Sequence, residues 1–216
     1  MEYIVKCRYC GGTYFVNSDA SNAKFSCDNC GASNCTDDII EAVASGAKTI
    51  TDAKDDDVHF EYYLNAAEQG DAHAQFKIGV YYDNGKGVAQ DLEKAAEWYT
   101  KAAEQGNMYA QNSLGICYFY GRGVEQDPAR EAEWYTKAAE QGYAKAQYNL
   151  GTCYADGRGV ELDYAKAVEW FTKAAEQGDQ KAMSQLGDYY KNGWGVAQDT
   201  EKADYWYQKA AEADAQ

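Results

Sequence analysis

Histidine and proline are almost absent from this 216-residue chain, which contains two histidines and one proline. Neither His59 nor His73 lies near a serine or cysteine in a recognisable nucleophile motif. No glycine-rich phosphate loop follows a predicted strand, because the Gly-x-Gly pairs belong to repeated turns. We therefore expect no catalytic residues and no bound organic cofactor, and we expect that the protein is not an enzyme.

Basic side chains are also scarce. The chain has 20 Lys and Arg against 35 Asp and Glu, which gives a formal net charge of −15. Because phosphate binding depends on clustered Lys and Arg, nucleic acid is not an expected partner. Solubility is the simplest interpretation of the acidity.

Long apolar runs are missing as well. No basic start is followed by an apolar stretch, so we expect no signal peptide. No run of about 18 apolar residues could form a membrane span. Seven cysteines without an export signal favour metal ligands and free thiols over disulfides. These features predict a cytoplasmic protein, expected as a monomer, without membrane contact.

A period of 36 residues runs through most of the chain. The string Ala-Ala-Glu-Gln-Gly occurs four times at this spacing, ending at Gly70, Gly106, Gly142 and Gly178. The period predicts a half unit over 58–69 followed by four full repeats. These repeats cover 70–105, 106–141, 142–177 and 178–213.

Each repeat contains two helical patterns. In the first repeat, Ala74 and Ile78 lie on one stripe of the first helix, while Trp98 and Tyr99 lie on one face of the second. In the second repeat, Pro128 follows the predicted N-cap Asp127, at the first helical position where proline is well tolerated. One unit cannot bury its apolar face alone, so we expect the units to stack.

A glycine recurs in the middle of every predicted first helix, at Gly79, Gly115, Gly151 and Gly187. Glycine inside a helix costs about 1 kcal/mol relative to alanine. Its recurrence in all four repeats predicts that another backbone approaches closely at this point.

Together these motifs resemble the Sel-1-like repeat, a relative of the tetratricopeptide repeat. The shared patterns are Ala-x3-Leu-Gly-x2-Tyr, Gly-x-Gly-Val-x2-Asp and Ala-x2-Trp-Tyr-x2-Ala-Ala-x2-Gly, and they cover residues 58–213. The resemblance implies an all-α fold, a right-handed solenoid of antiparallel helix pairs over 58–216. Family members usually act as adaptors, so it also implies a scaffold for protein–protein interaction.

We call the set of equivalent positions in successive repeats a column. The same resemblance places five columns of the first helices on a concave groove. These columns vary between repeats, whereas the core columns barely change, and exposed aromatics on one face often mark a protein contact. We predict that a protein or peptide binds there, against His73, Phe76, Val80, Tyr109, Ile116, Phe119, Tyr120 and Tyr148. In the alternative interpretation, some of these side chains fill gaps between adjacent first helices.

Two Cys-x2-Cys pairs separated by 16 residues lie near the N-terminus. Two such pairs can place four thiolates tetrahedrally around one zinc ion. Residues 13–16 and 24–26, between the pairs, are predicted to form the strands of a β-hairpin. This arrangement resembles a zinc ribbon. Residues 1–35 are therefore predicted to bind one structural Zn²⁺ per chain through Cys7, Cys10, Cys27 and Cys30.

Two alternatives to zinc remain: iron in a rubredoxin-like site, and disulfide bonds. Zinc is favoured because four ligands close the site and nothing nearby suggests electron transfer. Ribbon thiolates can also be oxidised, which leaves a second functional hypothesis of a metal- or redox-responsive regulator.

Residues 36–57 are predicted to form an acidic linker between the two parts. Ile39, Ile40, Val43 and Ala47 could make one short amphipathic helix in this linker.

Overall fold

The computed structural model describes residues 2–6, 13–17, 39–40 and 55–214. The chain divides into two units, Met1–Ala53 and Lys54–Gln216. In the first unit, the strands β1 (Glu2–Lys6), β2 (Thr13–Asn17) and β3 (Ile39–Ile40) form an antiparallel sheet in the order β2-β1-β3. Tyr3 is paired with Val16, and Val5 with Ile39.

The sheet corrects one expectation for the linker. Ile39 and Ile40 do not begin a helix; they form a strand that pairs with β1. Isoleucine is branched at Cβ and suits an extended, paired backbone better than a helix. The predicted strand over 24–26, the rest of the linker over 41–54 and all four predicted zinc ligands lie outside the described residues.

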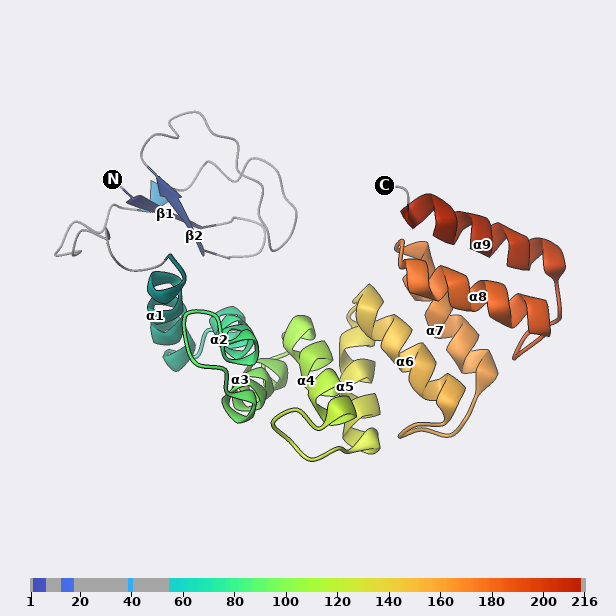
Figure 1. The fold of residues 1–216 in the computed structure, drawn as a ribbon, viewed down its shortest axis with the longest axis horizontal. Coiled ribbons are helices and arrows are strands. Elements are labelled where there is room, and N and C mark those ends of the chain that lie inside the picture. Colours follow the sequence, from blue (N-terminus) through green and yellow to red (C-terminus); the bar gives the residue numbers. More distant parts are fainter. Residues whose placement is uncertain (1, 7–12, 18–38, 41–54, 215–216) are drawn as a thin grey trace. The chain divides into compact units, whose positions relative to one another are not determined.

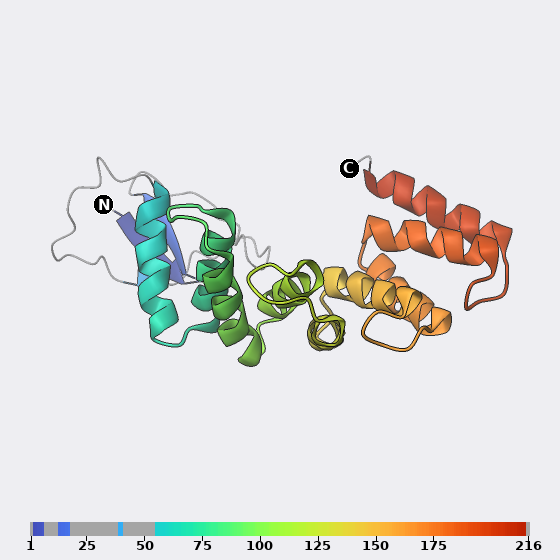
Figure 2. The same ribbon diagram turned by 60° about the horizontal axis from the view of Figure 1, so that its bottom comes forward.

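The second unit is an all-helical solenoid over residues 55–214, as the repeats predicted. Its described helices follow one another along a curved row (Figure 1), and the rotated view shows the same order (Figure 2). They are α1 (Asp55–Glu68), α2 (Ala72–Asn84), α3 (Leu92–Glu104), α4 (Met108–Tyr120), α5 (Pro128–Glu140), α6 (Ala144–Asp156), α7 (Tyr164–Glu176), α8 (Gln180–Asn192) and α9 (Thr200–Asp214). None of these helices is long and apolar enough to cross a membrane.

The helix boundaries follow the predicted capping residues. The Asp71 carboxylate accepts a hydrogen bond from the Ala74 amide at 2.6 Å at the start of α2. Asp127 does the same for two amides at the start of α5, where Pro128 takes the first helical position. Helix α2 ends at Gly85, whose φ of 64° lies in the left-handed region that glycine enters without strain.

The glycine inside each first helix faces an aromatic ring of the second helix of the same repeat. A Cβ atom on Gly115 would lie 2.5 Å from Tyr135 Cε1, and Gly151 faces Phe171 in the same way. The nearest group at this column is therefore a ring, and at Gly151 a backbone group is also close, since the Ala167 carbonyl oxygen would lie 3.3 Å from the Cβ atom. A ring occupies the space that a missing side chain leaves.

The closest backbone approaches occur in the loops. A Cβ atom on Gly123 would overlap the carbonyl group of Leu92, at the start of α3 in the preceding repeat. Gly159 has the same relation to Pro128, at the start of α5. Each of these loops therefore lies against the second helix of the repeat before it, and only glycine fits.

Buried glutamines connect consecutive repeats through hydrogen bonds. Gln111 donates from Nε2 to the Ala103 carbonyl at 3.1 Å, and its Oε1 accepts from Gln141 at 2.7 Å. The same pair of bonds is made by Gln75 and by Gln147 in their own repeats. The last repeat has Met183 and Ala213 in these two columns, so both partners of the pair are replaced together.

The two aromatics of each second helix differ in burial. Tyr135 and Phe171 are buried in the core, whereas the preceding Trp134 and Trp170 are only partly buried. A lysine covers each of these tryptophans, with Lys137 Nζ 3.8 Å from the centre of the Trp134 ring. The core aromatic of the repeat is therefore the residue after the tryptophan.

We expect Gly115→Ala to lower the free energy of unfolding by about 1–3 kcal/mol, because the new methyl group overlaps the Tyr135 ring. Alanine is a better helix former than glycine, so helix propensity alone would raise the free energy of unfolding. Chemical denaturation followed by circular dichroism measures the change, with Ser113→Ala on the same helix as the control. In a double-mutant cycle, Tyr135→Leu should relieve part of the cost. A stabilised Gly115→Ala variant would contradict this packing.

Candidate functional site

The predicted binding residues lie on three first helices. His73, Phe76 and Val80 are on α2, Tyr148 is on α6, and the other four are on α4. We call this set of eight residues the first-helix face. Tyr120 is 63% exposed, and the other seven side chains are partly buried. Each member therefore offers some surface to solvent, but most of that surface is the edge of a packed side chain.

Aromatic contacts link the first-helix face from one repeat to the next. The ring centres of Phe76 and Tyr109 are 5.9 Å apart, and those of Tyr109 and Tyr143 are 5.2 Å apart. Tyr143 immediately precedes α6, so these rings connect three consecutive repeats. Tyr148 lies 5.7 Å from Phe171 on α7. The contacts of Tyr109 with Phe76 and Tyr143 are gap-filling contacts of the kind that the alternative interpretation expects, whereas Tyr148 packs against the second helix of its own repeat.

An arginine bridges the first and second repeats beside this face. Arg122, in the loop after α4, donates from Nη2 to Asp83 of α2 at 2.6 Å. The Tyr99 hydroxyl donates to the same carboxylate at 3.4 Å. Asp83 is thus held by groups from both repeats.

A second arginine bridges the second and third repeats with different partners. Arg158, in the loop after α6, places Nε 3.3 Å from the carboxylate of Glu131 on α5. Its guanidinium carbon lies 4.3 Å from the centre of the Phe119 ring. Glu131 is only 1% exposed, and burial raises its pKa although Arg158 acts in the opposite direction. Phe119 occupies the column of Asp83. The acid that pairs with the arginine is therefore on the first helix in one bridge and on the second helix in the other, whereas the arginine is in the same column in both.

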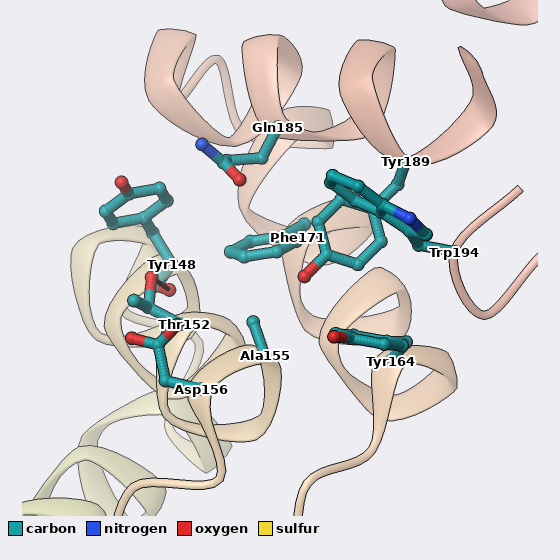
Figure 3. Close-up of a pocket in the computed structure, with 9 residues that line it drawn as sticks. All are labelled: Tyr148, Thr152, Ala155, Asp156, Tyr164, Phe171, Gln185, Tyr189 and Trp194. Atoms are coloured by element: carbon teal, nitrogen blue, oxygen red, sulfur yellow. Dashed lines mark hydrogen bonds between the residues drawn. The ribbon is translucent and has the colours of Figure 1, made fainter. Parts of the chain in front are cut away.

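We call the contact region between two consecutive repeats a junction. The third junction, between the third and fourth repeats, lacks an arginine bridge of this kind. Trp194 occupies the column of Arg122 and Arg158. Ala155 occupies the column of Asp83 and Phe119, and an alanine at position 167 occupies the column of Glu131. A pocket of about 360 Å³ is present here. It is lined by Tyr148, Thr152, Ala155, Asp156, Tyr164, Phe171, Gln185, Tyr189 and Trp194, which we call the third-junction pocket (Figure 3).

Five aromatic rings dominate the third-junction pocket. Trp194 stacks on Tyr164 with ring centres 6.3 Å apart, and it meets Tyr189 edge-on at 5.5 Å. In Figure 3, Tyr148 and Asp156 lie on one side of the space, and Tyr164 and Trp194 on the other. Of these residues, only Tyr148 is among the eight predicted binding residues. The available signal was the column of Lys86, Arg122 and Arg158, in which Trp194 is the exception.

The two cysteines of the solenoid are structural. Cys117 and Cys153 are buried, and burial raises the pKa of each thiol to about 12. Both are therefore protonated at neutral pH, which makes them poor nucleophiles. Among the residues that the structure describes, no three His, Cys, Asp or Glu side chains are grouped so that they could hold a metal ion.

Comparison with known proteins identifies the repeat. The family model described as Sel1 repeat matches residues 60–71, 72–107, 109–143, 144–179 and 180–214. No curated protein sequence matches the chain.

Two solved structures share the fold at substantial sequence identity. One is c5321, a protective antigen of uropathogenic Escherichia coli, with 44% identity and a TM-score of 0.69. The match covers 71% of this chain and 33% of that protein. The other is a Sel1 repeat protein from Oxalobacter formigenes, with 36% identity and a TM-score of 0.70, covering 73% of this chain and 65% of that one. This chain therefore spans less than two thirds of the length of either protein.

The raised pKa of Glu131 predicts a pH dependence of stability. The folded protein binds the proton of this carboxyl more tightly than the unfolded chain, so its contribution to stability is lost as pH rises through the folded pKa. Relative to a Glu131→Gln variant, the wild type should therefore become less stable as pH rises above about 4.5.

Unfolding free energies measured between about pH 4 and pH 7 would test this difference. Glu133→Gln, on the exposed face of the same helix, controls for the loss of one negative charge. A difference between wild type and Glu131→Gln that stays constant, or moves in favour of the wild type, would show that burial does not dominate at Glu131.

Proposed function

Because the chain belongs to the Sel1 repeat family, we propose that its solenoid is a non-catalytic scaffold that binds a protein or peptide along the first-helix face. The observation that carries this proposal is the contrast between columns. Core columns such as Gly115 and its equivalents are constant in all four repeats, since a ring packs against each of them. The columns of the first-helix face change from repeat to repeat, and the structure leaves part of each of these side chains exposed.

The packing within the face shapes the proposal. Phe76, Tyr109 and Tyr143 hold one another in place, so their exposed edges lose little conformational freedom when a partner binds. Aromatic side chains that are fixed in this way are typical of binding hot spots. Tyr120 projects furthest into solvent and offers the largest new contact area.

We also propose that residues 1–35 bind one Zn²⁺ through Cys7, Cys10, Cys27 and Cys30, and that this ribbon is an accessory contact module. The spacing of the cysteine pairs supports this proposal. A monomeric state and a cytoplasmic location stay predictions.

Removing exposed aromatics of the first-helix face should weaken partner binding. Once a partner has been isolated by affinity purification, Tyr109→Ala combined with Tyr120→Ala should raise the Kd by at least about tenfold. Helicity should change little, because neither side chain is among the buried residues of the core clusters, but the loss of the Tyr109 contacts with Phe76 and Tyr143 should lower the free energy of unfolding.

Isothermal titration calorimetry gives the Kd, and circular dichroism checks the fold. Tyr205→Ala is the matched control, since Tyr205 is an exposed tyrosine on α9 outside the first-helix face. An unchanged Kd in the folded double variant would show that the partner binds elsewhere.

Pure protein expressed with ample metal should contain about one equivalent of zinc per chain. Cys10→Ser should remove most of this zinc and leave the melting of the solenoid helices nearly unchanged, because the cysteines and the solenoid belong to different units of the chain. Elemental analysis and thermal melting followed at 222 nm measure the two effects. Wild-type protein with much less than one equivalent of zinc, or with iron instead, would refute the zinc assignment.

A further inference from the structure

The three junctions between full repeats differ in the group that lies beside the column of Asp83, Phe119 and Ala155 on the first helix. At the first junction, the guanidinium of Arg122 lies against Asp83. At the second, the guanidinium of Arg158 lies over Phe119. At the third, the equivalent partner on the first helix is Ala155, which lines the third-junction pocket, and the arginine is replaced by Trp194. At the first two junctions an arginine of the chain thus provides the guanidinium group, whereas at the third junction no arginine is among the described residues that line the pocket beside Ala155.

The lining of the pocket matches a cation. Aromatic rings attract cations over their faces, and tryptophan is the strongest of them. Trp194 is 46% exposed and Tyr164 is also exposed, so this aromatic wall can be reached from solvent. The nine lining residues include one carboxylate, Asp156, and no lysine or arginine. The electrostatic character of the pocket is therefore that of an acceptor for positive charge.

Asp156 is able to take part in this recognition. Its side chain is 54% exposed, and it forms a loose ion pair with Arg158, whose Nη1 lies 3.8 Å away. A carboxylate accepts two parallel hydrogen bonds from a guanidinium in the geometry that the planar group requires. Lysine can match the charge but not this geometry.

The volume sets a limit on the ligand. About 360 Å³ is near the lower end of the range of ligand pockets, roughly 300–1,000 Å³. The pocket can hold one long side chain but not a large cofactor. Because Tyr148 belongs both to the pocket and to the first-helix face, a peptide bound along the face could place one side chain in the pocket.

We propose that the third-junction pocket binds the guanidinium group of an arginine in a basic segment of the protein partner. This inference rests on the proposed scaffold function and names the chemistry of its partner. The guanidinium would stack between Trp194 and the facing residues of α6, with Asp156 as its acceptor. The net charge of −15 favours encounter with a basic segment over an acidic one.

The test uses the full-length protein and four short peptides, Ac-Gly-Ser-X-Ser-Gly-NH₂, in which X is arginine, citrulline, lysine or leucine. Citrulline has nearly the shape of arginine without its charge. Peptides are titrated into ¹⁵N-labelled protein while the Trp194 indole resonance is followed by NMR, and a Trp194→Phe spectrum assigns this resonance. We expect the arginine peptide to bind with a Kd at least about tenfold below that of the citrulline peptide, and more tightly than the lysine and leucine peptides. Equal affinity for arginine and citrulline, or tighter binding of lysine or leucine, overturns the proposal.

Variants of the pocket give an independent readout. Trp194→Arg restores the arginine found at the other two junctions, so the chain should fill its own pocket and lose the arginine peptide. Asp156→Asn removes the acceptor at an exposed helix end, where the fold tolerates the change, and should raise the Kd several-fold. Tyr205→Ala should bind like the wild type. Wild-type affinity in a folded Trp194→Arg or Asp156→Asn variant overturns the proposal.

The isolated partner separates this inference from the scaffold proposal. If Tyr109→Ala with Tyr120→Ala weakens partner binding while Trp194→Arg does not, the scaffold function stands and the arginine pocket is refuted. If both variants weaken binding, both are supported. If neither does, both are refuted.

Discussion

The contact between a glycine in each first helix and an aromatic ring of the second helix is the constraint on which the solenoid depends. A side chain on Gly115 would take the space of the Tyr135 ring, so the two helices could not approach to their observed separation. The loop glycines apply the same condition between repeats, since Gly123 and Gly159 touch the preceding second helix through backbone alone. The buried glutamines then satisfy the carbonyls at these junctions. Together these three columns fix the repeat and leave little freedom for variation within it.

Variation is therefore concentrated at the edges of the junctions. Asp83, Phe119 and Ala155 occupy one column: Arg122 binds Asp83, Arg158 lies over Phe119, and Ala155 lines a pocket together with Trp194. The exchange of a carboxylate for a ring is possible because an arginine binds favourably to both. At the third junction, where the small Ala155 and Trp194 occupy these two columns, the same geometry produces an open aromatic pocket instead of a filled junction. A rigid repeat with variable junctions is a suitable basis for selective binding along one face.

The first-helix face combines two roles that are often treated as alternatives. Phe76 and Tyr109 fill gaps between adjacent first helices, and the same contacts hold their exposed edges in fixed positions. A binding surface made in this way loses little entropy on association. It also means that a substitution at Tyr109 can affect stability and binding together, whereas Tyr120 contributes mainly surface.

The sequence by itself determined the period, the helix pairs, the aspartate caps and the turns, because these depend on local signals that occur four times. It also indicated which columns vary. Only the tertiary structure decided what each column faces. Gly79 and its equivalents face an aromatic ring of the second helix, and Tyr135 is buried while Trp134 is covered by Lys137. Both aromatics lie on the same helix face, so periodicity could not separate them.

The third-junction pocket could not be predicted from the sequence for a related reason. Ala155 and Trp194 are 39 positions apart, on different repeats, and they line one pocket only because the stacking of the repeats brings the end of α6 near the loop after α8. The strand at Ile39–Ile40 is a similar case, since its partner β1 lies more than 30 residues away in the sequence. Local patterns fix local structure, whereas a pocket or a strand pair exists only once distant segments have packed together.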